Sequence, residues 1–243
     1  MFQREFYFYN SVRKSYEEIV EAETENSSKI LDFLPKPFTL PGPLTFSRGF
    51  EEPLVLEDLS QLGYARGKDD IKGFDLNHTE EAMVAFGQLH ALGIVLLEKK
   101  GLDDNTLAEL LELDMRMIFT APVIELNERG MISFKEWMID NNYNEEAIKN
   151  LDKKLDNNNW KKDFEKLFEE GKLHELQTIQ HGDANCYNVL FKYETETGRP
   201  TSCKLVDFQV CSCFPPFFDL AYFLGVWVQS DVLIPHYNTI LER

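Results

Sequence analysis

The chain has 243 residues, of which 43% are hydrophobic, and its formal net charge is −17. This length and composition suffice for one large domain or two small ones with a real core. The acidic balance argues against nucleic acid or an anionic membrane as a main partner, because both need a cationic surface. It leaves ATP binding open, since a metal ion and a few local dipoles can outweigh distant carboxylates.

The four cysteines occur without a CxxC pair or a His-rich tract, so we expect reduced, buried thiols rather than a metal site. The first residues lack the apolar core of a signal peptide. The longest apolar run, residues 217–228, is shorter than a bilayer span and contains Asp219. We therefore expect a soluble, cytoplasmic protein with no membrane partner.

The first 24 residues carry a helical pattern, because their apolar positions are spaced three and four residues apart. Four prolines between residues 35 and 43 then predict an extended connection. Residues 44–50 and 53–59 predict two short antiparallel strands. The apolar face of the predicted helix consists of Phe2, Phe6, Tyr9, Val12, Tyr16, Ile19 and Val20.

A polar stretch from Gly63 to Gly73 marks a boundary, after which the pattern is mainly helical until about residue 177. We expect helices to be separated at Pro122, at Gly130 and at an Asn-rich segment. A hairpin turn at residues 195–200 joins two of three short strands that follow. The predicted helices span residues 78–98, 104–120, 133–150, 159–170 and 217–228, and the predicted strands span 178–183, 188–194 and 202–209.

The most informative residues lie between 181 and 209. Asp183 leaves a strand, where a carboxylate can face a substrate hydroxyl, and Asn188 follows five residues later with a neutral oxygen that can ligate magnesium. Asp207 ends an apolar run and can reach the same metal from the neighbouring strand. Phosphoryl transfer needs these groups, because its catalysis is mainly positioning and charge neutralisation. His181 is placed to brace the loop. The alternative is that Asp183 and Asp207 are turn residues bonded to backbone.

This motif and three further segments of the chain together resemble a known family. The chain resembles the ecdysteroid-kinase-like family in the sequence HGD, in Asn188, and in the sequences VDFQ and PPFFDLAYFL. This family belongs with choline kinases and aminoglycoside phosphotransferases in the protein-kinase-like fold. The resemblance extends to FxxExxFY at residues 2–9, to LVLEDL at 54–59 and to the helix that ends in His90 and Ala91. It therefore covers nearly the whole chain.

The resemblance implies an α+β, bilobal, protein-kinase-like fold, with residues 1–59 as part of the N-lobe and 60–243 as a mostly helical C-lobe. It implies ATP and Mg²⁺ as cofactors and a small-molecule hydroxyl, such as one on a steroid-like compound, as acceptor. The catalytic residues would be Asp183, as the base, and His181. The residues implied to bind the cofactors are Asn188 and Asp207 as magnesium ligands, the backbone of Glu57, Asp58 and Leu59 for adenine, and Glu5 as the partner of a phosphate-binding lysine.

Two other residues receive structural roles. Asp219 would fix the catalytic loop, and His90 would be a packed core histidine. Residue 185 is Asn where many relatives have Trp, and we expect this difference to affect loop packing rather than the proton acceptor.

The chain departs from the family pattern at both ends. The Gly-rich loop and the lysine strand of the family precede the helix of Glu5, and its further helices follow the DLAYFL helix. We therefore expect an incomplete N-lobe, a truncated C-lobe and a fragment that is inactive or slow, since the lost groups stabilise charge. The alternative function is a non-catalytic kinase-like module or pseudoenzyme. A protein kinase is disfavoured, because HRD and APE are absent. The acceptor and the oligomeric state are not predicted.

Overall fold

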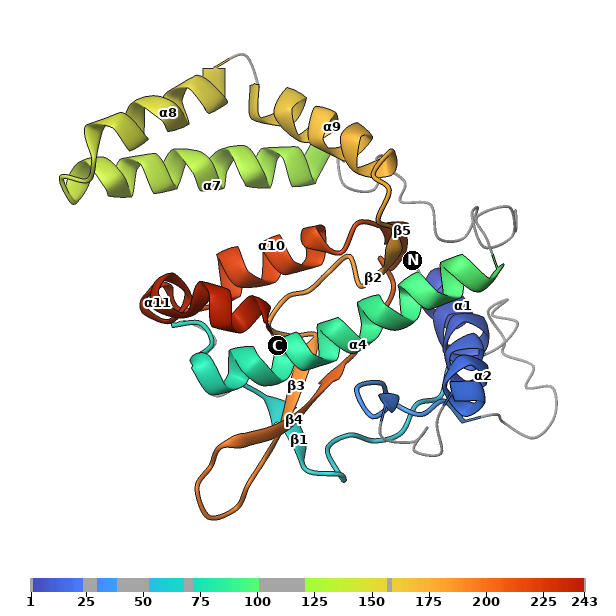
Figure 1. The fold of residues 1–243 in the computed structure, drawn as a ribbon. Coiled ribbons are helices and arrows are strands. Elements are labelled where there is room, and N and C mark those ends of the chain that lie inside the picture. Colours follow the sequence, from blue (N-terminus) through green and yellow to red (C-terminus); the bar gives the residue numbers. More distant parts are fainter. Residues whose placement is uncertain are drawn as a thin grey trace. The chain divides into compact units, whose positions relative to one another are not determined.

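The computed structural model describes residues 2–23, 30–38, 53–67, 72–100, 121–156 and 159–242. The chain divides into two compact units, one of Met1–Glu112 with Leu176–Arg243 and one of Leu113–Glu175 (Figure 1). The named strands all belong to the first unit, where they form two small antiparallel sheets. This mixture of helices and small sheets confirms the predicted α+β class. The predicted division into lobes after residue 59 stays a prediction.

The N-terminal helix confirms the predicted pattern of residues 1–24 and contains one irregularity. It consists of α1 (Phe2–Tyr7), a π-helical turn η1 (Phe8–Val12) and α2 (Arg13–Glu23). Its fully buried face includes Tyr9 and Tyr16, as the spacing predicts, and also Phe8, which the spacing did not single out.

The segment around Pro37 pairs with residues 55–57, although the sequence predicted it only as an extended connection. Pro37 and Leu56 form an antiparallel bridge, and Glu57 N donates to Lys36 O at 2.9 Å. The predicted partner strand, residues 44–50, lies outside the described residues. The buried Lys204 supports this region, because its Nζ donates to Leu34 O at 3.0 Å and lies 3.3 Å from Glu57 Oε1.

The predicted hairpin is present and belongs to a three-stranded sheet. β3 (Val189–Tyr193) pairs with β4 (Pro200–Leu205) on one side and with β1 (Tyr64–Arg66) on the other. β4 ends at Leu205, earlier than the predicted strand 202–209, because the chain turns at Asp207, whose φ is +67°. A second sheet pairs β2 (Thr178–Gln180) with β5 (Ser212–Phe214), and the sequence did not predict β5.

The helix α4 (Leu76–Lys100) is the core helix of this unit, and it contacts β2, β4, α2 and α11. Among the described helices it alone has the length and composition of a membrane span, but over half of that stretch is buried in the fold, as in a core helix. Gly93 lets β2 approach closely, because a Cβ at this position would lie 2.4 Å from Ile179 N. α10 (Phe217–Trp227) and α11 (Ser230–Leu241) complete the unit.

The second unit contains α7 (Ala121–Asp140), α8 (Glu145–Leu155) and α9 (Asn159–Lys172), which confirms the helix predicted at 159–170. The single helix predicted over 133–150 is wrong, because it breaks where Asn142 adopts a φ of +51° and Asn144 caps α8. The predicted separator Gly130 instead lies inside α7, where an exposed glycine is tolerated at about 1 kcal/mol. The predicted helix 104–120 lies outside the described residues.

Candidate active site

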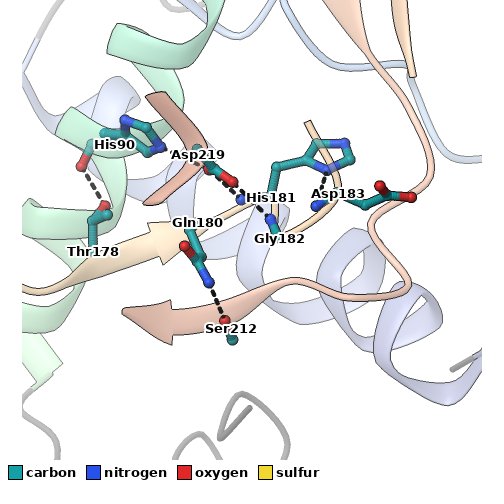
Figure 2. Close-up of polar contacts among 8 residues, drawn as sticks. All are labelled: His90, Thr178, Gln180, His181, Gly182, Asp183, Ser212 and Asp219. Carbon is teal, nitrogen blue, oxygen red and sulfur yellow. Dashed lines mark hydrogen bonds and ion pairs between the residues drawn. The ribbon is translucent and has the colours of Figure 1, made fainter. Parts of the chain in front are cut away.

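The loop after β2 is fixed by a buried carboxylate on α10. Asp219 Oδ2 accepts from His181 N at 2.7 Å, and Asp219 Oδ1 accepts from Gly182 N at 2.9 Å (Figure 2). Gly182 has a φ of +80°, and a Cβ there would lie 2.3 Å from Val210 O, so the position requires glycine. Asp219 therefore has the structural role that the sequence implied.

The histidine His90 is more than a packed core residue, since its ring contacts Asp219. His90 Nε2 lies 2.9 Å from Asp219 Oδ2, and Thr178 Oγ1 donates to His90 O at 2.7 Å (Figure 2). Burial alone would raise the pKa of Asp219, but the hydrogen bond and charge of His90, with further help from His181 and Gly182, hold this pKa below its usual value. Asp219 is therefore ionised, and His90 Nε2 is the donor. α4, β2 and α10 thus meet in one buried network.

The ring of His181 braces the loop through both nitrogens. Nε2 donates to Val206 O at 2.8 Å, because a carbonyl can only accept, and Nδ1 then accepts from Asp183 N at 3.3 Å. The ring is fully buried and packs against Phe208 at a centroid distance of 4.6 Å. With both nitrogens engaged by the protein, His181 fits a positioning role better than proton transfer.

The carboxylate of Asp183 points away from the Asp219 network (Figure 2) and receives two side-chain amides. Asn185 Nδ2 donates to Asp183 Oδ1 at 2.9 Å, and Asn188 Nδ2 donates to Asp183 Oδ2 at 3.2 Å and to Asp183 O at 2.9 Å. Asn185 therefore touches the carboxylate itself, contrary to the expectation that it affects loop packing alone. Its short amide two residues after Asp183 was the signal that could have suggested this contact.

The β3–β4 hairpin brings the second carboxylate to this loop. Val206 N donates to Asn188 O at 3.0 Å, so Asp207 follows directly after a residue paired with Asn188. Since the Asn188 side chain contacts Asp183, Asn188 links the two acidic residues. Within the described part of the chain, no hydrogen bond reaches Asn188 Oδ1, and Asp207 accepts one, from Gln209 Nε2 to Oδ2 at 3.3 Å. One amide oxygen and one carboxylate oxygen thus stay available to a cation.

The carboxylate of Glu5 reaches the same turn from the N-terminal helix. Glu5 Oε1 accepts from Phe208 N at 3.3 Å. Burial, and then the negative charge of Asp207, raise the pKa of Glu5, and the bond from Phe208 lowers it in part. The described residues hold no group of three or more His, Cys, Asp or Glu side chains arranged for a metal. The predicted ligand set is one amide and one carboxylate, from Asn188 and Asp207, and so small a set suits Mg²⁺, which keeps water and phosphate oxygens as further ligands.

The segment Glu57–Leu59 presents its backbone rather than its side chains. Glu57 Oε1 accepts from Lys36 N at 3.1 Å, and the Asp58 carboxylate accepts from Ser60 N and Oγ at 3.0 and 2.6 Å. These bonds to Ser60 lower the pKa of Asp58. In contrast, no hydrogen bond from any described residue reaches Glu57 O or Leu59 N. Among the described residues, one backbone acceptor and one donor two residues apart therefore have no partner.

The buried Asp219 on α10, the HGD loop after β2 and the hairpin that returns Asp207 to that loop all lie in one unit of the chain. The model of the ecdysteroid kinase-like family matches residues 1–243. The chain therefore belongs to this family, as its motifs indicated. The family is one of kinase-like phosphotransferases with small-molecule acceptors. Neither the curated proteins nor the solved structures contain a match.

Proposed function

We propose that the chain transfers the γ-phosphoryl group of ATP, with Mg²⁺, to a hydroxyl of a small molecule, at the low rate at most that its sequence predicts. The observation that carries this proposal is the link that Asn188 makes between Asp183 and the hairpin of Asp207. In-line phosphoryl transfer needs a carboxylate for the attacking hydroxyl beside oxygen ligands for the cation. Asp183 would supply the carboxylate, and Asn188 and Asp207 would supply the oxygen ligands.

Each residue has a distinct part in this proposal. Asp183 orients the acceptor hydroxyl and takes its proton, since its carboxylate projects from the loop and is partly exposed. Asn188 Oδ1 and the Asp207 carboxylate would hold the cation, which neutralises charge on the phosphates when bound. His181 and Asp219 keep the loop backbone fixed, so that little reorganisation is needed during the reaction.

The nucleotide base would bind at the segment of Glu57 and Leu59. Adenine offers a donor and an acceptor on one edge, and Glu57 O with Leu59 N offers the complementary pair. Lys36 N donates to Glu57 Oε1, and Lys204 Nζ forms an ion pair with the same oxygen, so both contacts hold this backbone in place. This arrangement supports adenine binding through main-chain atoms.

The acceptor belongs, in this proposal, to the hydroxylated small molecules, with steroid-like compounds first. Burial, and then the charge of Asp183, raise the pKa of the Tyr222 phenol on α10, which indicates that Tyr222 lies near Asp183. Tyr222 is 40% exposed, so it offers an amphipathic surface beside the proton acceptor. We place the protein in the cytoplasm, where ATP and Mg²⁺ are available.

The direct test is the variant Asp183→Asn, assayed for phosphorylated product against a panel of hydroxylated small molecules. We expect turnover to fall by roughly 10²–10⁴-fold, because general-base catalysis contributes on that order. Nucleotide affinity should change little, since Asp183 faces the acceptor. Asp231→Asn, at an exposed position of α11, is the matched control.

Two outcomes would oppose the proposal. Normal turnover in Asp183→Asn would remove Asp183 as the proton acceptor. Tight nucleotide binding without transfer to any acceptor in the panel would favour the non-catalytic module instead.

A further inference from the structure

The N-terminal helix is interrupted by the π-helical turn Phe8–Val12, between α1 and α2. Such turns are rare and occur mostly as single interruptions of α-helices, frequently at functional sites. A π-turn holds one residue more than an α-turn. It therefore offsets the helical face before it from the face after it by about one residue, or about 100°.

The half of the helix after the π-turn is fixed in the core. Tyr16 and Val20 are buried, and α2 packs against α4. The orientation of α2 is therefore set by the body of the unit. The orientation of α1 follows from α2 through the π-turn.

The half before and within the π-turn contacts one short segment, residues 207–211. Glu5 Oε1 accepts from Phe208 N at 3.3 Å, and Arg4 Nη1 donates to Cys211 O at 3.1 Å. Phe8 stacks on Phe208 with ring centroids 3.7 Å apart and planes 5° apart (the Tyr9 ring meets the same ring edge-on at 5.8 Å). The segment that follows Asp207 is thus held by two hydrogen bonds and two aromatic contacts from one helix.

This segment needs external support, because Asp207 has a φ of +67°, which residues other than glycine seldom adopt. The next residue, Phe208, is fully buried between Phe8 and the ring of His181. The contacts on Phe208 therefore determine where the Asp207 carboxylate lies relative to Asn188.

We propose that the π-turn sets the rotational phase of α1 so that Glu5 and Phe8 seat the Asp207 turn, which makes both of them positioning residues for the cation site. This inference rests on the proposed function only in taking Asp207 as a cation ligand. Glu5 acts through the backbone N–H of Phe208, a role that it fills in addition to any contact with a cationic side chain.

The test removes one residue from the π-turn. Asn10 is exposed, and its side chain donates to Phe6 O in its own helix, so deleting it shortens the turn without removing a core group. Because α2 is fixed, the deletion rotates Glu5 away from Phe208. We expect amide exchange of residues 207–211 to be about tenfold faster, as for the loss of about one hydrogen bond's stabilisation. We also expect the Mg²⁺ concentration for half-maximal nucleotide binding to rise about tenfold. Asn10→Ala, which keeps the helix length, should change either quantity less than about twofold.

If the deletion variant does not fold, point variants give the same information. Glu5→Ala should accelerate exchange at Phe208, whereas Glu5→Gln, which keeps an acceptor oxygen, should restore most of the protection. Phe8→Leu, which keeps an apolar side chain but loses the stack, should accelerate exchange of the segment and raise the Mg²⁺ requirement together.

A folded deletion variant with unchanged exchange at residues 207–211 would overturn the inference, as would faster exchange with an unchanged Mg²⁺ requirement. Failure of the proposed function looks different. If the unmodified chain binds no Mg²⁺–nucleotide, the function fails, while the exchange contrast between the deletion and Asn10→Ala still supports the positioning role.

Discussion

The loop that carries Asp183 and the turn that carries Asp207 differ in what holds them. The loop is fixed by Asp219, a fully buried carboxylate that accepts from two backbone N–H groups and from His90. The turn is fixed by aromatic stacking and by Glu5, which is only half-buried. The pKa values of these two anchoring carboxylates also shift in opposite directions: the pKa of Asp219 is lowered and that of Glu5 is raised.

This difference separates stability from function in the site. The Asp219 network joins α4, β2 and α10, so disturbing it affects the fold as a whole. The contacts on Phe208 join the N-terminal helix to one turn, so disturbing them alters the cation site first. We expect the loop of Asp183 to be the most stable part of the site and the turn of Asp207 to be the most easily displaced, with Asn188 between them.

The largest effect on stability should follow Asp219→Ala. This change leaves His181 N and His90 Nε2 buried without an acceptor and removes the acceptor of Gly182 N, which costs about 3–5 kcal/mol of unfolding free energy. Urea unfolding measures it, with Asp231→Asn as the exposed control. A loss below about 1 kcal/mol would show that the loop is not anchored by this carboxylate.

The anchoring carboxylate also has a defined pH dependence. Because the folded pKa of Asp219 is lowered, its stabilisation is present above the unfolded pKa of about 3.9 and is lost as the pH falls through the folded value. The stability gap between the unmodified chain and Asp219→Asn should therefore shrink on acidification below about pH 4. Glu5 has the opposite sign: its raised pKa favours the folded state at low pH, and this contribution is lost as the pH rises through the folded value.

A smaller effect should distinguish two glycines of α4. Gly93→Ala places a Cβ 2.3 Å from Thr178 Oγ1 and 2.4 Å from Ile179 N, so β2 must shift at a cost of about 1–3 kcal/mol. A Cβ at Gly87 would meet no atom of another segment within 4 Å, and Gly87→Ala should stabilise the helix by about 0.5–1 kcal/mol. Thermal unfolding of the pair decides. Equal effects would contradict the close approach of β2 to α4.

Much of this organisation follows from local sequence. Helical spacing marks the N-terminal helix and α4, and the turn residues around Gly198 mark the β3–β4 hairpin. The motif spacing also predicts Asp183, Asn188 and Asp207 as members of one site. These features depend on residues close together in the chain, where periodicity and turn chemistry are informative.

The remaining features depend on contacts between distant segments. The pairing of β2 with β5 joins Thr178 to Phe214 across the whole β3–β4 hairpin, and the partner of residues 55–57 is the segment around Pro37. The π-turn was not predicted, because a 3.6-residue pattern assumes a regular α-helix, and Phe8 is the buried residue that this pattern left out. The break after α7 follows from the cap of Asn144, which outweighs the helical spacing around it.

The central claim is that Asn188 and Asp207 hold a cation beside Asp183, and Mg²⁺-dependent nucleotide binding tests it most directly. Titration of ATP with and without Mg²⁺ should show an affinity gain from Mg²⁺ in the unmodified chain and in Asp183→Asn. In Asp207→Asn this gain should fall about tenfold or more, because one ionised ligand is lost. An undiminished gain in Asp207→Asn, with the variant still folded, would contradict the claim.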